Sequence, residues 1–118
     1  MRHRPESLED MKKEYIGKWR IEEMELWDRD FIDLVATGQI IVKGSGIGSI
    51  RFGAFQGGLD CRVEKIEENE RLEFSFEGLD EGDQVSGRGW AFVEEEKMTG
   101  KIYFHLGDDS GFKAKKIK

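Results

Sequence analysis

The feature that most constrains the fold is a series of short segments in which apolar and polar residues alternate. The clearest runs from Arg71 to Glu77, where Leu72, Phe74 and Phe76 alternate with charged and hydroxyl residues. Strict alternation places every second side chain on the same face, as in a β-strand with one buried face. Comparable segments fill most of the chain after residue 14, so the sequence predicts an all-β protein.

The alternating segments define eight predicted strands. They cover residues 15–27, 39–43, 46–56, 59–66, 71–77, 84–94, 97–106 and 111–117. The connections are too short for the crossovers that parallel strands require, so the sheet is expected to be antiparallel. Gly57-Gly58 is expected to form one of the hairpin turns. The pattern predicts an eight-stranded antiparallel up-and-down barrel, with a β-sandwich of the same hairpins as the alternative.

The length of 118 residues indicates one barrel domain, residues 15–118, preceded by a helical segment at 1–14. Eight phenylalanines and three tryptophans supply enough large apolar side chains for a core. A second helical turn is expected after the first strand. Either Asp28 or Asp30 is a candidate cap, Phe31, Leu34 and Val35 have helical spacing, and Gly38 is a natural stop. This turn would cross a mouth of the barrel, where a lid would lie.

The first predicted strand changes phase in its middle. Trp19 and Ile21 share one face, whereas Met24 and Leu26 share the other. A bulge at Glu22-Glu23 would let both pairs face one core while bending the strand.

Gly17-Lys18-Trp19, after a helical turn, resembles the entry motif of the lipocalins and of the wider calycin group. The resemblance implies an up-and-down barrel that binds a small apolar ligand, and the chain length is closer to that of avidin-like barrels. It also implies that a late basic residue, Lys113 or Lys115, packs on Trp19. The run from His105 to Phe112, with Gly87-Arg88-Gly89-Trp90, resembles small uncharacterised bacterial proteins and implies no activity.

The charge pattern limits the partners and the compartment. The net charge is −6, so we expect no nucleic acid as a partner, because such binding depends on neutralising phosphates. No apolar run is long enough to span a membrane, and residues 1–15 lack the apolar core of a secretion signal. The only cysteine, Cys61, cannot form an intrachain disulfide. We therefore predict a cytoplasmic protein.

Candidate catalytic and metal-binding groups are sparse. His105, Asp109 and Ser110 contain the residue types of a catalytic triad, but nothing in the pattern marks Ser110 as a nucleophile. Asp28, Asp30 and Asp33 fail the calcium-loop pattern, which requires glycine at its sixth position. We expect no enzymatic activity, no cofactor and no metal, with a hydrolase using His105 and the nearby aspartates as the least favoured alternative.

The resemblance favours a non-enzymatic barrel that binds a small apolar or acidic ligand in its open end. The candidate ligand-binding residues are Trp19, Trp27, Phe31, Arg88, Trp90, Tyr103 and His105. Arg88 beside Trp90 would be a polar group in the cavity, or would lie across the outside of the sheet with its stem packed. The alternative function is a protein–protein interaction module or homodimer with a filled core. Trp27 and the acidic loop at 80–83 would then contact the partner.

Overall fold

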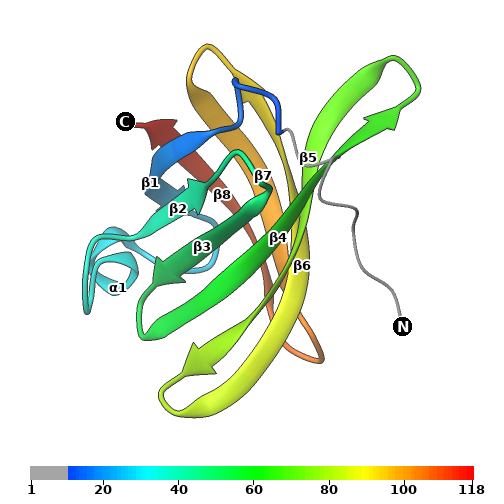
Figure 1. Cartoon of the computed structure of the whole chain (residues 1–118). Helices are drawn as coiled ribbons and strands as arrows, with labels where there is room; N and C mark the ends of the chain where they lie inside the picture. The colour runs from blue at the N-terminus through cyan, green and yellow to red at the C-terminus, as the bar shows by residue number, and fades with distance from the viewer. Residues whose placement is uncertain (1–10) are drawn as a thin grey trace.

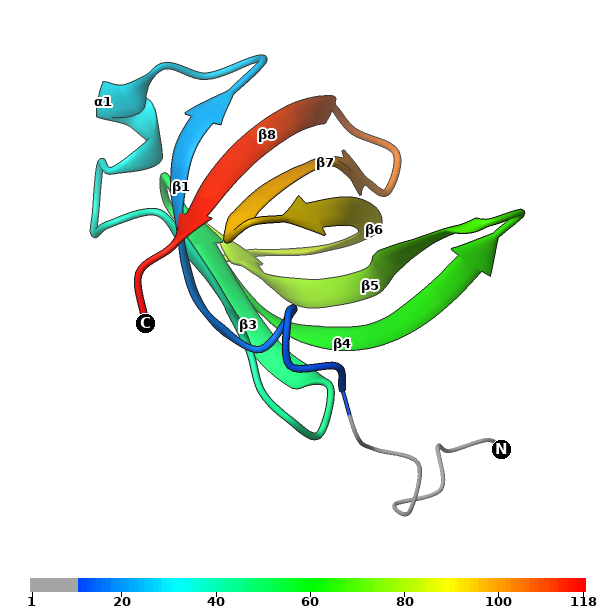
Figure 2. The same cartoon turned by 90° about the horizontal axis from the view of Figure 1, so that it is seen from above.

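The computed structural model describes residues 11–118, which form a closed antiparallel barrel with the strands in chain order (Figure 1). The elements are β1 (Gly17–Met24), α1 (Arg29–Ile32), β2 (Gln39–Val42), β3 (Ile47–Phe52), β4 (Phe55–Ile66), β5 (Asn69–Asp80), β6 (Asp83–Glu94), β7 (Lys97–Phe104) and β8 (Asp109–Lys116). The predicted eight-stranded up-and-down barrel is confirmed, and the sandwich is excluded because β1 pairs with β8. In the view from above, the β4–β5 hairpin extends well beyond the other strands (Figure 2).

The seam between β1 and β8 contains the predicted bulge. The register shifts between Ile21 and Glu23, and both Ile21 and Met24 are buried. The prediction that Leu26 also faces the core is wrong, because 50% of it is exposed. The strand ends at Met24, and the backbone N–H of Leu26 donates to Ser110 Oγ at 3.2 Å instead of continuing the ladder.

The predicted turn at Gly57-Gly58 is wrong, because both glycines lie inside β4. The chain reverses earlier, at Gly53-Ala54. Gly53 has a φ of +60°, which side chains other than glycine adopt only with strain. At Gly57 a Cβ would lie 2.6 Å from the carbonyl oxygen of Glu77, so glycine there serves close strand approach.

The interior is occupied by aromatic rings at the end of the barrel nearest α1. Phe52, Phe55, Phe76 and Phe104 come from four strands, and their ring centroids lie 5.1 to 6.2 Å apart in edge-to-face contacts. Such spacing is normal for packed aromatic cores. The described part of the chain thus has a filled aromatic core at this end.

The glycines of β6 make this packing possible. A Cβ on Gly87 would lie 2.5 Å from Cζ of Phe76, and one on Gly89 would lie 2.5 Å from Cζ of Phe74. Both phenylalanine rings therefore reach across to the backbone of β6, where any side chain would collide with them.

The opposite end of the barrel is closed by Trp19 and Tyr15, both almost fully buried. The Nε1–H of Trp19 donates to the carbonyl oxygen of Tyr15 at 3.0 Å. Nζ of Lys116 lies 5.2 Å from the centre of the Trp19 ring, because Lys116 is opposite Trp19 in the β1–β8 register. The prediction of Lys113 or Lys115 in this place is wrong, since both point to the outside and are exposed. The predicted N-terminal helix lies mostly outside the described residues, and residues 13–15 form a turn.

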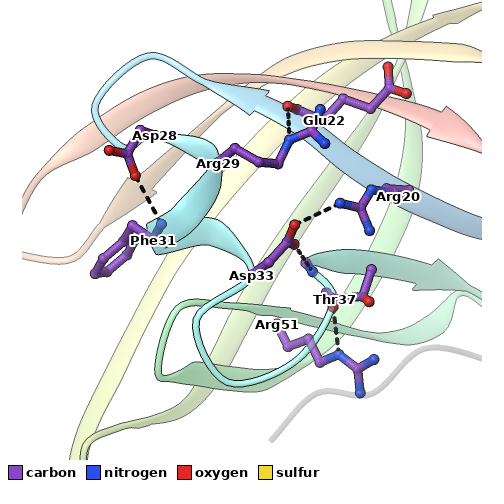
Figure 3. Close-up of polar contacts among 9 residues, drawn as sticks. Arg20, Glu22, Asp28, Arg29, Phe31, Asp33, Thr37 and Arg51 are labelled. Carbon is purple, nitrogen blue, oxygen red and sulfur yellow. Dashed lines mark hydrogen bonds and ion pairs between the residues drawn. The ribbon is translucent and has the colours of Figure 1, made fainter.

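The connection between β1 and β2 contains the predicted helical turn, α1. Asp28 caps it, since its carboxylate accepts from the backbone N–H of Phe31 at 2.9 Å. The helix ends at Ile32, which is fully buried, whereas Leu34 and Val35 are 63% and 70% exposed and do not share a packed helical face. Asp33 joins this segment to the barrel by accepting from Arg20 at 2.6 Å and from the N–H of Gly38 at 2.8 Å (Figure 3).

The same segment is also held by two arginine side chains that donate to backbone carbonyl oxygens and by one bond between backbone groups. Nε of Arg29 donates to the carbonyl oxygen of Glu22 at 3.1 Å, and Nε of Arg51 donates to that of Thr37 at 2.8 Å (Figure 3). The N–H of Gly53 donates to the carbonyl oxygen of Ile32. These bonds fix α1 beside the ends of β1 and β3.

Candidate functional site

The seven predicted ligand-binding residues lie in three separate places. Trp19 is buried at the closed end of the barrel. Trp27 and Phe31 stack on each other beside α1, with centroids 5.7 Å apart, and Trp27 also contacts Phe52 at 5.3 Å. The remaining four, Arg88, Trp90, Tyr103 and His105, lie on or beside the outside of β6 and β7.

The alternation of β6 decides which of its faces is outside. Gly89 and Ala91 are buried, since phenylalanine rings and the β7 backbone press against this face. Arg88 and Trp90 therefore point outward, where Arg88 is exposed and Trp90 half-buried. The interpretation of Arg88 as a cavity group is wrong, and its alternative, an arginine lying across the outside of the sheet, is confirmed.

Aromatic and basic side chains interleave on this outer surface, which we call the aromatic face. Its members are Arg71, Arg88, Trp90, Phe92, Lys101 and Tyr103, from β5, β6 and β7. The guanidinium carbon of Arg71 lies 5.1 Å from the centre of the Trp90 ring, and that of Arg88 lies 4.9 Å from that of Tyr103. Nζ of Lys101 is 5.5 Å from the same tyrosine ring. These are cation–π distances, so the rings and cations hold one another in place.

The two largest apolar groups of the face are in contact and partly open to solvent. Trp90 and Phe92 meet edge to face with centroids 5.6 Å apart, and 42% of Phe92 is exposed. Tryptophan, tyrosine and arginine are the side chains enriched where protein interfaces bind most strongly. The aromatic face therefore has the residue types of an interaction surface.

Carboxylates border the face on two sides. Arg71 pairs with Glu73 at 2.7 Å and with Glu64 at 3.4 Å, and Lys101 pairs with Asp109 at 3.4 Å. Burial, together with the neighbouring Glu64, raises the pKa of Glu73 above its usual value, although Arg71 opposes the rise. Arg88 is exposed and forms no ion pair with another residue that the structure describes.

Two of the three residues considered as a catalytic triad, Ser110 and Asp109, take part in other interactions. Ser110 is fully buried, and its hydroxyl accepts from the N–H of Leu26 and donates to the carbonyl oxygen of Gly111 at 2.9 Å. Asp109 pairs with Lys101 on the surface. His105 is exposed in the turn after β7. The predicted strand 97–106 ends earlier, at Phe104, because Leu106 lies in the same turn with a φ of +57° and is 96% exposed.

Two of the three aspartates near α1 act as structural groups. Asp28 caps the helix, and Asp33 binds Arg20 and the backbone of Gly38. Within residues 11–118, no group of three histidine, cysteine, aspartate or glutamate side chains is placed to hold a metal ion.

A groove of about 750 Å³ lies on the outside of β2 to β5. Its walls include Gln39, Ile41, Arg51, Gln56, Glu77 and Leu79, and glycine backbone forms part of its floor. These side chains alternate with the core residues of their strands, so the groove opens on the outer face of the sheet, although the core residue Ile50 also lines it.

The sequence pattern missed Arg71, Phe92 and Lys101 as members of the candidate site. Their strands were predicted, but the cross-strand register was not. Trp90 lies directly opposite Glu73 and Lys101, and Tyr103 directly opposite Arg88. Counting back from each hairpin turn would have placed these residues together, because turn position fixes register.

Comparison of the chain with protein-family models, with curated proteins and with solved structures found no match. No helix in residues 11–118 is long and apolar enough to cross a membrane.

Proposed function

We propose that this barrel is a non-enzymatic interaction module that binds a partner protein through the aromatic face. The observation that carries the proposal is the exposed Trp90–Phe92 contact framed by Arg71, Arg88 and Lys101. The part of these rings that stays exposed to water contributes no burial of apolar surface to the stability of the fold. Binding a partner would remove their apolar surface from water.

The filled core supports this function over ligand binding inside the barrel. The phenylalanine cluster and the ring-to-glycine contacts of β6 occupy the interior that a lipocalin-like ligand would need. The residues proposed for such a ligand do not line one cavity: Trp27 and Phe31 stack beside α1, whereas Arg88, Trp90 and Tyr103 lie on the outside of β6 and β7.

A photo-crosslinking experiment in the host tests the proposal. Benzoyl-phenylalanine is placed at Phe92, and in a matched control at Ile47, which is exposed to a similar degree on β3. We expect a discrete protein adduct from position 92 that is absent from position 47 and lost when Trp90→Ala is added. Equal adducts from both positions, or an adduct that survives Trp90→Ala, would contradict the proposal.

Small-ligand binding remains a second candidate function, favoured by the groove outside β2 to β5. Its mixed lining of amide, charged and aliphatic groups suits a small polar molecule. Native mass spectrometry of freshly purified protein tests it: a molecule at one per chain that is lost in Arg51→Ala would support this function. A bare monomer would count against it.

A further inference from the structure

We propose that the partner presents an acidic, extended segment to the aromatic face and to three adjoining lysines, Lys97, Lys113 and Lys115. The inference rests on the function proposed above and names the chemistry of the partner. We call these three residues the lysine row.

Charge is the first argument. Facing outward from β6, β7 and β8 are five cations, Arg88, Lys97, Lys101, Lys113 and Lys115, against two carboxylates, Glu94 and Asp109. The whole chain nevertheless carries a net charge of −6. The outer face of β6 to β8 thus carries a net positive charge in an acidic protein. Such separation attracts and orients a negatively charged partner.

The cross-strand register gives the second argument. Lys97 lies directly opposite Lys115 on β8 and opposite Glu94 on β6, and Arg20 lies opposite Lys115 on its other side. Like charges in facing positions destabilise a sheet. Arg20 is neutralised by Asp33, but no member of the lysine row forms an ion pair with a described residue. Carboxylates of a bound partner would relieve this repulsion.

The spacing of the face fits an extended peptide. Four successive outward rows contain Arg88, Tyr103 and Asp109, then Trp90 and Lys101, then Phe92 and Lys113, and finally Glu94, Lys97 and Lys115. Rows on one face are two residues apart, so these four span about 20 Å. An extended peptide repeats its side-chain direction at the same interval. Carboxylates at its ends would meet Arg88 and the lysine row, while apolar side chains between them would meet Trp90 and Phe92.

Nucleic acid is less suited to this surface than an acidic peptide. Base stacking needs open ring faces, but Arg71 lies over Trp90, and Arg88 and Lys101 lie over Tyr103.

Fluorescence anisotropy with a labelled dodecapeptide of glutamates and two tyrosines tests the inference. We expect binding to the full chain, weakening as salt rises, and at least about tenfold weaker binding to Lys113→Gln/Lys115→Gln and to Arg88→Gln. The matched control is Lys43→Gln/Lys65→Gln, which removes the same charge from exposed positions elsewhere. It is expected to bind as the unchanged chain does, and circular dichroism checks that each variant is folded.

Several outcomes would overturn the inference. Equal binding of a peptide with glutamine in place of glutamate would exclude charge as the determinant. Tighter binding of oligothymidine would assign the face to nucleic acid, and a dimer that dissociates in Lys113→Gln/Lys115→Gln would assign it to a second copy. If the acidic peptide fails to bind while the crosslink at position 92 persists, the partner chemistry is wrong and the interaction function stands.

Discussion

At the scale of single residues, the glycines of β6 determine which side of that strand faces the core. Changing Gly89→Ala would place a Cβ 2.5 Å from Cζ of Phe74 and 2.6 Å from the carbonyl oxygen of Lys101. The oxygen belongs to the backbone, so the strands must move apart. We expect a loss of about 1–3 kcal/mol in the free energy of unfolding, measured by urea denaturation.

Gly58→Ala is the matched control, since Gly58 lies in β4 and the nearest atom to its Cβ position is 4.0 Å away. Alanine there should leave stability unchanged or raise it by about 0.4–1 kcal/mol, because it restricts the unfolded chain. If Gly89→Ala proved as harmless as Gly58→Ala, the core of this barrel would be looser than described.

Tyr15 gives a pH-dependent prediction. Burial, with the nearby carboxylates of Glu70 and Glu14, raises its pKa from 10.0 to about 12. The folded state therefore holds this proton more tightly than the unfolded state, and the contribution to stability is complete below pH 10. It is lost as the pH rises from about 10 to 12. Comparing Tyr15→Phe with the unchanged chain by urea unfolding across this range should show a smaller alkaline loss for the variant. Parallel losses would show that Tyr15 does not contribute.

At the scale of elements, the β1–β2 connection depends on one side chain. Asp33 accepts from Arg20 at 2.6 Å and from the N–H of Gly38 at 2.8 Å. We expect Asp33→Ala to cost about 1–3 kcal/mol, since it leaves a half-buried guanidinium and an amide without their acceptor. Hydrogen exchange should accelerate at residues 29–38 while the strands away from this connection keep their protection.

Two variants test this interpretation. Asp33→Asn keeps an acceptor for Gly38 and should lose less stability than Asp33→Ala. Asp30→Ala, an exposed change within α1, should alter stability by less than about 0.5 kcal/mol. A uniform rise in exchange over the whole barrel after Asp33→Ala would contradict a local role.

The strands were predictable where alternation alone decides their faces, as in β5, where Leu72, Phe74 and Phe76 are buried as predicted. The turn between β3 and β4 was not, because Gly57-Gly58 has the composition of a hairpin turn while the chain uses Gly53. A glycine needed for a positive φ and a glycine needed for close packing look alike in sequence. The outward position of Trp90 was not predicted for a related reason. The alternation of β6 does not show that Gly87 and Gly89 face Phe76 and Phe74 in the core, and only the cross-strand register shows it.

At the scale of the whole molecule, closure of the barrel depends on the last residues of the described chain. At the end of β8, the N–H of Lys116 donates to Glu96 in the turn before β7, that of Ile117 donates to Lys18, and that of Lys18 donates to Lys118, each onto a backbone carbonyl. Lys116 also lies over the Trp19 ring that closes this end. The β1–β8 seam therefore uses both backbone and side-chain contacts at the same place.

Deleting Lys116, Ile117 and Lys118 removes both kinds of contact, whereas replacing all three by alanine keeps the backbone bonds and removes only the side chains. At about 0.5–1.5 kcal/mol for each hydrogen bond, the deletion should cost roughly 2–4 kcal/mol in urea unfolding. The alanine variant should lose about 1 kcal/mol, the contribution of a cation–π contact. If the two variants were equally destabilised, the lysine over Trp19 rather than the backbone ladder would hold the seam closed. The larger loss for the deletion is expected because two of the three backbone bonds join β1 to the residues at and after the end of β8, and an open barrel would leave these groups without partners.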